Sequence, residues 1–434
     1  MLRKPLVHSL YYSSIQSYEI FILAGSFLLS IFSRDYKRDM LHETIEDLYP
    51  GSKAYTYSSG RSAISAALAC IKVQQGDEIL VSSFTCLAVP TAVLDAGAKP
   101  IYCDVDSETL NMTVSNILQA ITPKTRAIII QHTMGIIAPI IELKKVLQGT
   151  GIIIIEDCAL SIGSRLNNEF VGHEGNFSIF SMELSKAISC GWGGVLLVND
   201  NQFFSDADNK YGETGYLKKI TRLRMLFQTI VSAALNLPQF YRWKLSSFLT
   251  ACLFKLKIFQ PSTPSTELQG ITSRDFKSKL PSELIPLAIH QWSRLNSISI
   301  ICKSHSHQLA DHLVSIGFSP KAIFFNANES SSVRLPLLVS NRELFISHLL
   351  NAGFEIGLWF HGPLSPLPGS KKFLYDSSRF PNSLFLSQHM INLPSHSRLN
   401  NQNIDYLKLA LTQYIKSNPE ESKFQKSLQR NLMH

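Results

Sequence analysis

Four isoleucines at residues 152–155, followed directly by Glu156 and Asp157, constrain the fold more than any other feature of this chain. A short β-branched run without polar alternation indicates a strand that is buried on both faces. Such strands are typical of parallel sheets covered by helices, and ligands bind beyond the carboxyl ends of those strands. The run therefore predicts an α/β fold that places Asp157 at a ligand-binding edge.

Strand-like and helix-like segments alternate on both sides of this run. Strands are expected at residues 78–81, 100–103, 127–131, 178–181 and 195–198, with helices after Ser59-Gly60-Arg61-Ser62 and at residues 140–147. This alternation predicts a large domain, residues 51–213, with a mainly parallel sheet flanked by helices.

The second half of the chain has a different pattern. Helices are expected at residues 283–298, 302–316, 342–352 and 403–415, and a strand at 334–338. They predict a smaller α+β domain over residues 266–434, with a polar, frayed tail after Ser417.

Residues 1–50 are expected to form an N-terminal arm with one or two helices. Its apolar run, residues 20–32, has 13 residues, fewer than the roughly 20 that span a bilayer. We interpret it as a packed helix or an oligomer contact. Membrane-surface contact and a cleaved or spanning segment are the alternatives.

The formal net charge of +8 is concentrated in one segment. No acidic residue occurs between Glu213 and Glu267, where eight basic residues lie: Lys218, Lys219, Arg222, Arg224, Arg242, Lys244, Lys255 and Lys257. With two apolar stretches and a linker at 261–266, residues 214–265 predict a basic amphipathic insertion that contacts an anionic membrane surface. The alternatives are packing on its own protein and binding of a polyanionic substrate. No nucleic-acid-binding motif accompanies the charge, so no nucleic-acid partner is expected.

The seven cysteines are scattered, and no CxxC pair or other metal-ligand spacing occurs among them. This usage favours a reduced, cytoplasmic protein without disulfides. No metal site is predicted.

Lys186 lies about thirty positions after Asp157, between an expected strand and a glycine-rich turn at residues 191–194. Pyridoxal phosphate needs a lysine for a Schiff base and an aspartate that keeps its pyridine nitrogen protonated. The helix beginning at Gly60 offers free backbone N–H groups and a dipole that suit a phosphate, and Arg61 could add a charge-assisted hydrogen bond. The order and spacing of these residues predict a pyridoxal 5′-phosphate site.

These residues also carry a resemblance to a known family. Ile155-Glu156-Asp157-Cys158-Ala159, Val171-Gly172, the stretch from Phe180 to Lys186, and Gly193-Gly194 resemble motifs of the DegT/DnrJ/EryC1/StrS family. Members of that family are fold-type-I aminotransferases that use pyridoxal phosphate and act on nucleotide-linked keto-sugars. The resemblance runs from about Tyr57 to Asp200, with fainter matches to about Leu411.

The resemblance implies a role for each matching residue. Lys186 would form the Schiff base and move the proton, and Asp157 would pair with the pyridine nitrogen. The remaining implied cofactor contacts are Gly60, Arg61, Ser62 and Ser181 around the phosphate, Cys86 where many members stack an aromatic ring, and Leu160 where many have glutamine. His132 and His361 are weaker candidates for substrate contacts, and packing at a strand end is the alternative for His132.

The resemblance further implies a ping-pong aminotransferase that moves an amino group from glutamate to a nucleotide-linked keto-sugar, for surface polysaccharide or lipopolysaccharide. It implies a cytoplasmic homodimer, and the basic insertion could hold the protein at the inner face of the membrane. The chain departs from the family at Asn176, where aspartate is common, and at residues 277–280, where members carry an asparagine-containing segment that completes the neighbouring subunit's site. Two alternatives stay open. One is dehydratase-like sugar chemistry, disfavoured because histidine is typical at the Lys186 position there, and the other is a non-catalytic scaffold.

Overall fold

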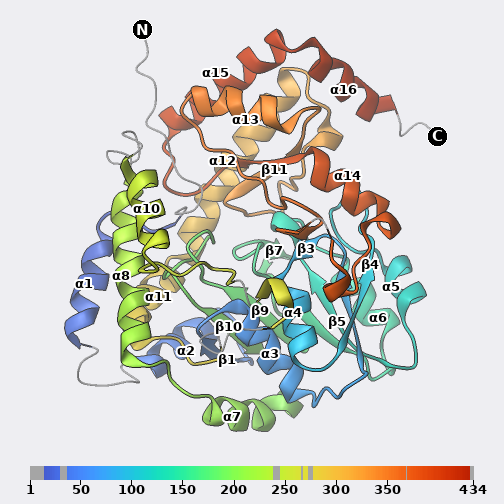
Figure 1. Cartoon of the computed structure of the whole chain (residues 1–434). Helices are drawn as coiled ribbons and strands as arrows, with labels where there is room; N and C mark the ends of the chain where they lie inside the picture. The colour runs from blue at the N-terminus through green and yellow to red at the C-terminus, as the bar shows by residue number, and fades with distance from the viewer. Residues whose placement is uncertain are drawn as a thin grey trace.

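The computed structural model describes residues 14–29, 37–237, 245–264, 267–271, 277–367 and 369–430 (Figure 1). A seven-stranded sheet forms its centre, in the order β1-β10-β9-β6-β5-β2-β4. The strands are β1 (Lys53–Tyr57), β10 (Gly194–Val198), β9 (Phe177–Ser181), β6 (Ile153–Asp157), β5 (Thr125–Gln131), β2 (Glu78–Ser82) and β4 (Lys99–Cys103).

The sheet is mainly parallel, as the sequence predicts. From β9 to β4 all neighbouring strands are parallel, and only β10 runs antiparallel to its two neighbours. The isoleucine run forms β6 at the centre of the sheet, where Ile155 pairs with Ile129 on one side and Phe177 on the other. Strand β1 is a seventh strand that sequence patterning did not identify.

Helices cover both faces of the sheet, which confirms the α/β class. Ile155 and Ile129 pack into a core with the helices α3 (Gly60–Cys70), α4 (Ala88–Asp95) and α7 (Phe204–Glu213). Ile154 and Ile128 face the opposite side, where α5 (Val114–Ala120) and α6 (Ile140–Val146) lie. Alternate isoleucines of one run therefore reach two different cores.

The C-terminal half contains a two-stranded antiparallel sheet of β11 (Arg334–Leu338) and β13 (Met390–Pro394). The helices of this half are α11 (Ile285–Ser293), α12 (Leu295–Ser315), α13 (Arg342–Asn351), α14 (Pro381–His389), α15 (Asn401–Ser417) and α16 (Pro419–Arg430). The expected helix break near residues 299–301 is wrong, because α11 ends at Ser293 and α12 continues through that region. Ile298 and Cys302 are both buried at a spacing of four residues, so one helical face stays in the core.

The expected frayed tail is also wrong, because residues 419–430 form α16. Glu421 is fully buried and accepts hydrogen bonds from the backbone N–H (3.0 Å) and hydroxyl (2.8 Å) of Ser340. Gln425 donates to the carbonyl of Leu338 at 2.9 Å. The contacts that hold this helix in place are made by polar side chains. A polar composition by itself is typical of a loose tail, which is why the sequence suggested one.

The insertion forms a helical layer at one side of the molecule (Figure 1). Helix α8 (Lys219–Leu235) lies between α10 (Leu245–Lys255) and α1 (Glu19–Leu29), contacting both, and α1 also contacts α11. Leu23 of α1 is fully buried, and the Ser26 hydroxyl donates to the carbonyl of Glu283 at 2.6 Å. The described part of the run at residues 20–32 is thus a packed helix. Within the described residues, no helix combines the length and the apolar character needed to cross a membrane.

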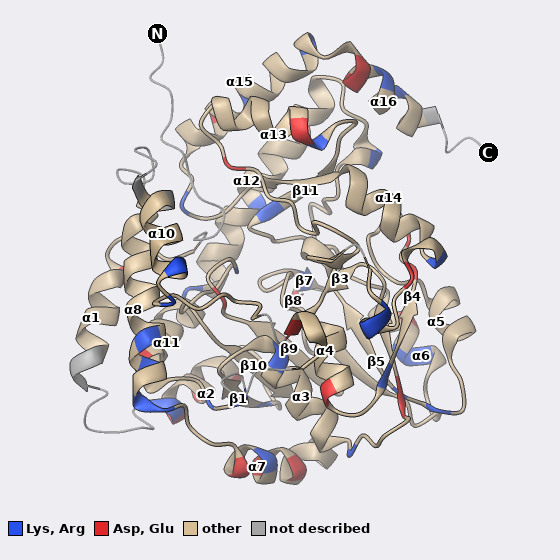
Figure 2. Cartoon of the chain, viewed as in Figure 1, with Lys and Arg blue, Asp and Glu red and all other residues tan. Residues whose placement is uncertain are grey.

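Lys and Arg (blue in Figure 2) occur along α8. Two of the basic residues in the insertion make contacts within the protein itself. Arg222 is buried, pairs with Glu283 at 3.6 Å and donates to the Ser282 hydroxyl at 3.1 Å. Arg224 donates to the carbonyls of Lys257 and Ile258. The exposed basic residues that remain are Lys218, Lys219, Lys255 and Lys257, and Arg242 and Lys244 lie outside the described residues.

Residues 277–280 lie along the outer edge of β1. The Ser58 N–H donates to the Ser278 carbonyl at 2.9 Å, and the Leu280 N–H donates to the Thr56 carbonyl at 3.1 Å. Lys279 forms an antiparallel bridge with Tyr57. The segment expected near a neighbouring subunit's site therefore extends this chain's own sheet.

Candidate active site

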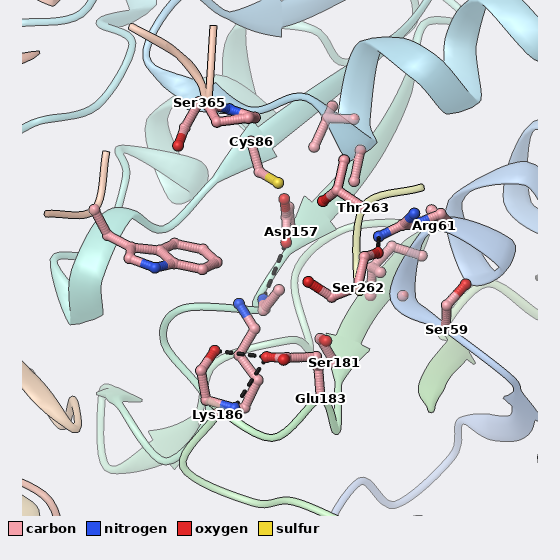
Figure 3. Close-up of a pocket in the computed structure, with 18 of the residues that line it drawn as sticks. Ser59, Arg61, Cys86, Asp157, Ser181, Glu183, Lys186, Ser262, Thr263 and Ser365 are labelled. Atoms are coloured by element: carbon pink, nitrogen blue, oxygen red, sulfur yellow. Dashed lines mark hydrogen bonds between the residues drawn. The ribbon is translucent and has the colours of Figure 1, made fainter. Parts of the chain in front are cut away.

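A cavity of about 620 Å³ lies beyond the carboxyl ends of β6 and β9 (Figure 3). The loop at residues 355–361 borders it, and so do Ser365 and Pro366. Ser365 pairs with Cys86, because β12 (Leu364–Ser365) runs parallel to β3 (Thr85–Cys86). Of the predicted site residues, the cavity is lined by Gly60, Arg61, Cys86, Asp157, Ser181, Lys186 and His361.

A fixed turn after β9 delivers Lys186 into this cavity. The Glu183 carboxylate accepts hydrogen bonds from the backbone N–H (2.9 Å) and hydroxyl (2.6 Å) of Ser185, and the Lys186 N–H donates to the Glu183 carbonyl at 3.0 Å. Burial lowers the pKa of the Lys186 amine, and Arg334 lowers it further while Glu183 opposes the shift. A lysine with a lowered pKa is more often neutral, and therefore more nucleophilic.

Asp157 ends β6 at the same cavity. Its Oδ1 accepts a hydrogen bond from the Ala159 N–H at 3.0 Å, and the side chain is buried. Burial raises the pKa of this carboxyl, although the Ala159 N–H and Lys186 both favour the charged form. A cation placed next to Asp157 would restore the ionised form, so the site suits a protonated ring nitrogen.

The N-terminus of α3 reaches the cavity between β9 and β10. Ser59 caps the helix by accepting from the Ser62 N–H at 3.3 Å. A Cβ on Gly194 would overlap the backbone of Ser59 and Gly60, so this approach requires glycine in β10. The helix start thereby faces Ser181, and the positive end of the helix dipole at this corner of the cavity suits an anion.

Three predicted residues lie elsewhere. Ser62 is buried with its hydroxyl 2.8 Å from that of Ser59, and it does not line the cavity. Leu160 packs against the core and borders a smaller neighbouring cavity, while Ala159 borders the large one. His132 is fully buried and faces Glu156, so its position fits the packing alternative. None of these three side chains lines the large cavity.

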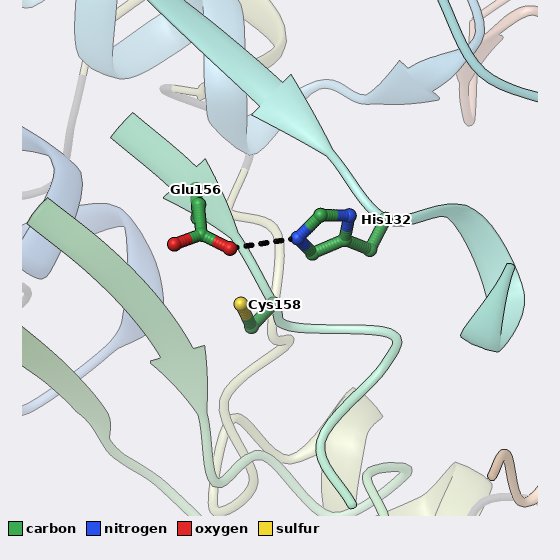
Figure 4. A group of neighbouring side chains, drawn as sticks. All are labelled: His132, Glu156 and Cys158. Atoms are coloured by element: carbon green, nitrogen blue, oxygen red, sulfur yellow. Dashed lines mark hydrogen bonds and ion pairs between the residues drawn. The ribbon is translucent and has the colours of Figure 1, made fainter. Parts of the chain in front are cut away.

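His132, Glu156 and Cys158 bring their ligand atoms within 4.8 Å of one another (Figure 4). His132 Nδ1 accepts a hydrogen bond from the Ala138 N–H at 3.1 Å, so Nε2 carries the proton and donates to Glu156 at 2.9 Å. Burial raises the pKa of the Cys158 thiol well above its ordinary value, which keeps it protonated. His132 and Glu156 thus form a hydrogen-bonded pair, and the protonated Cys158 thiol lies beside it.

The sequence did not identify two neighbours of Lys186, the aromatic Trp359 and the cationic Arg334. The Trp359 ring centroid lies 4.8 Å from Lys186 Nζ and 5.0 Å from the Arg334 guanidinium carbon. Arg334 is buried at the start of β11 and lines the cavity. The sequence could have identified Arg334 as a site residue, because it is a single arginine in an otherwise apolar strand and buried arginines need a partner or a ligand.

The residues present fit pyridoxal phosphate. One cavity holds an amine with a lowered pKa, a buried carboxylate that could pair with a ring nitrogen, and a helix N-terminus with hydroxyls beside it. These are the three groups that the aldehyde, pyridine and phosphate parts of the cofactor require.

Part of the chain matches a known protein family. Residues 35–219 match the DegT/DnrJ/EryC1/StrS aminotransferase family. A GDP-perosamine synthase of Escherichia coli O157:H7 is 36% identical over 151 residues, which are 35% of this chain and 42% of that protein. A UDP-N-acetyl-3-dehydro-alpha-D-glucosamine 3-aminotransferase of Acidithiobacillus ferrooxidans is 39% identical over 144 residues, 33% of this chain and 39% of that protein. The chain thus matches about two fifths of the length of these curated relatives.

Solved structures show the fold over nearly the whole chain. The putative sugar aminotransferase Spr1654 of Streptococcus pneumoniae, in its PMP form, superposes with a TM-score of 0.72 and 18% identity, covering 95% of this chain and 99% of that one. A GDP-4-keto-6-deoxymannose-3-dehydratase superposes with a TM-score of 0.71 and 18% identity, covering 94% of this chain and 100% of that one. At this identity the two similarities establish the fold and no more.

Proposed function

We propose that this chain is a pyridoxal phosphate-dependent aminotransferase that acts on a nucleotide-linked keto-sugar, because residues 35–219 match the DegT/DnrJ/EryC1/StrS aminotransferase family. The observation that carries this proposal is the single cavity in which Lys186, Asp157 and the α3 N-terminus meet. The proposal does not depend on Ser62, Leu160 or His132, which do not line that cavity.

The cofactor, when bound, supplies an electron sink for amino-group transfer. Asp157 would hold the ring nitrogen in its protonated form. Lys186 would hold the cofactor covalently and then, once released, carry the proton between cofactor and substrate carbon. Its lowered pKa supports that second role, because a base is most effective when its pKa lies near the working pH. Trp359 and His361 border the region where a substrate would enter.

The substrate class follows from the relatives, two of which are named for GDP- and UDP-linked sugars. We extend that class to this chain, with glutamate as the amino donor and a ping-pong order of reaction. The aminated sugar would then serve surface polysaccharide or lipopolysaccharide synthesis in the cytoplasm.

The first test is the absorbance spectrum of the purified protein with added pyridoxal phosphate. The wild type should develop a visible band that borohydride bleaches and glutamate removes, while Lys186→Ala should develop none. Lys303→Ala, at a lysine of α12 remote from the cavity lining, is the matched control. A wild type without the band at saturating cofactor would instead support the scaffold alternative. A band that glutamate leaves unchanged would favour another reaction or another donor.

We also propose a homodimer whose insertion contacts the inner face of the membrane. Exposed Phe248, Phe254 and Leu256 lie in and just after α10, next to exposed Lys255 and Lys257, a combination typical of surface-bound amphipathic helices. Light scattering after size-exclusion chromatography reports the dimer. Flotation with anionic vesicles should carry the wild type upward and leave Phe248→Ser/Leu256→Ser behind. Equal recovery of both proteins at the bottom would refute the membrane contact.

A further inference from the structure

A short segment of the insertion closes one end of the cavity. We call residues 261–264 the strap. Ser262 and Thr263 of the strap line the cavity together with Ser59, Gly60 and Arg61, at the end where the α3 helix begins (Figure 3). The sequence suggested only a linker here, because the segment is rich in proline, serine and threonine.

The start of the strap is anchored on α8. The Gln260 N–H donates to Gln228 Oε1 at 2.8 Å, and Gln228 Nε2 donates to the Gln260 carbonyl at 2.9 Å. Two hydrogen bonds between the same pair of residues fix both the position and the direction of the chain entering the strap.

Arg61 and Glu267 hold the strap against the helix. Arg61 Nη2 donates to the Ser262 carbonyl at 2.7 Å, and Nη1 pairs with the Glu267 carboxylate. The Glu267 side chain is 1% exposed and that of Arg61 10%. An ion pair this buried is strongly coupled, so removing one partner leaves a charge that disfavours the closed arrangement.

This pairing changes the role that the sequence suggested for Arg61. The Arg61 guanidinium already donates hydrogen bonds to a carboxylate and a carbonyl, and the carboxylate neutralises its charge. It would therefore attract a phosphate less strongly than an arginine without these partners. The hydroxyls at this end of the cavity then become the important donors, and those of Ser262 and Thr263 come from the strap.

We propose that Ser262 and Thr263 donate hydrogen bonds to the phosphate of the cofactor, and that Arg61 and Glu267 are positioning residues that keep the strap in place. The inference rests on the proposed function and names further ligands for the same site. It means that the insertion completes the phosphate end of the cavity from within one chain.

The test compares two ligands that differ only in the phosphate. Full-length wild type and Ser262→Ala/Thr263→Val are titrated with pyridoxal phosphate and with pyridoxal, following the visible absorbance and the tryptophan fluorescence. The variant should bind pyridoxal phosphate about 10-fold or more weakly, the scale of a lost hydrogen bond to a charged group. Pyridoxal affinity should stay within about 2-fold, because the hydroxyls act on the phosphate alone.

Two further variants separate the roles of the residues. Thr263→Ser keeps the hydroxyl and should retain wild-type affinity for pyridoxal phosphate. Glu267→Gln should weaken pyridoxal phosphate but not pyridoxal, because it releases the strap without changing Lys186 or Asp157.

The outcomes distinguish this inference from the proposed function. If the wild type forms the band and the double variant binds both ligands like the wild type, the strap does not bind the phosphate. Equal weakening of both ligands would also overturn the inference, since it would indicate a general disturbance of the cavity. A wild type that forms no band with either ligand overturns the proposed function, and the inference with it.

Discussion

Burial sets the chemistry of individual side chains in this molecule. It lowers the pKa of Lys186 and raises that of Asp157, so both groups move toward their neutral forms in the same cavity. Glu156, the immediate neighbour of Asp157, behaves differently: four hydrogen bonds to its carboxylate outweigh burial, and its pKa is lowered. One residue step along β6 therefore separates a carboxylate available to a ligand from one committed to the fold.

Asp157→Asn tests the ligand-facing carboxylate. The variant should still form the borohydride-sensitive band, because Lys186 is intact, but amino transfer should fall by about 10²–10³-fold, the scale of removing one preorganised electrostatic group. Single-turnover absorbance changes with glutamate measure this directly. An active Asp157→Asn variant would exclude the pyridine-nitrogen role.

Glu156→Gln tests the structural carboxylate through pH. A carboxyl whose folded pKa is below its unfolded value, about 4.3, stabilises the protein above that value and loses its contribution as the pH falls through the folded pKa. At neutral pH the variant should unfold more easily by at least about 1.5–3 kcal/mol, the range for a hydrogen bond to a charged group. Urea unfolding at pH 7 and in acid should show the difference between the two proteins shrinking toward low pH. A constant difference would contradict the lowered pKa.

Site residues could be predicted where their position in the sequence is enough to place them in the fold. Asp157 and Ser181 end strands of the sheet and Lys186 follows one, so their common edge was foreseeable. The direction of a side chain was not, and Ser62 and Leu160 do not line the cavity. The partner of Arg61 lies 206 residues away, and local patterns carry no information about such a pair.

At the level of elements, close backbone contacts decide how α3 meets the sheet. Gly193 forms a parallel bridge with Ser59, and Gly194 leaves the space that the start of α3 occupies. The helix N-terminus is useful for anion binding only because β10 has no side chain at this point.

Gly194→Ala should therefore displace α3 from β10. We expect destabilisation of about 1–3 kcal/mol or more from overpacking, together with weaker binding of pyridoxal phosphate. Gly212→Ala is the matched control, because Gly212 lies in α7 with no atom near a new Cβ. The control should be neutral or stabilising by up to about 1 kcal/mol. Thermal unfolding and cofactor titration of both variants measure these effects. Equal stability and equal cofactor affinity of the two variants would contradict the close contact between Gly194 and the start of α3.

Most strands could be predicted, with their limits, but the last helix could not. Three strands coincide with β-branched or apolar runs: those at residues 78–82, 99–103 and 334–338. Each end of these strands lies within one residue of its expected position. Helix α16 was missed because its contacts are made by Glu421 and Gln425, which periodicity of apolar residues does not detect.

Across the whole molecule, the two halves meet through Asp104 at the end of β4. Its carboxylate accepts hydrogen bonds from the backbone N–H groups of Asn382 (3.0 Å) and Ser383 (3.1 Å) and from the Ser383 hydroxyl (2.8 Å). A residue that follows a strand of the large sheet thus caps α14 of the C-terminal half, nearly 280 residues later. The α14 helix has no side-chain cap of its own.

Asp104→Ala should loosen α14 and the contact between the halves. A lost cap costs about 0.5–2 kcal/mol, and the loss should appear as faster hydrogen exchange in residues 381–389. Asp106→Ala, which removes only local bonds to Glu108 and Thr109, is the control and should leave that exchange unchanged. Unaltered exchange in Asp104→Ala would mean that other contacts hold the halves together.

The segment at residues 277–280 has a consequence for how this protein behaves in a crowded cell. An uncovered outer strand exposes a row of N–H and C=O groups that can recruit a strand from another molecule and begin aggregation. On β1 that row is already engaged by Ser278 and Leu280, with Lys279 between them. Detaching residues 277–280 would expose a template for fibrillar self-association along β1.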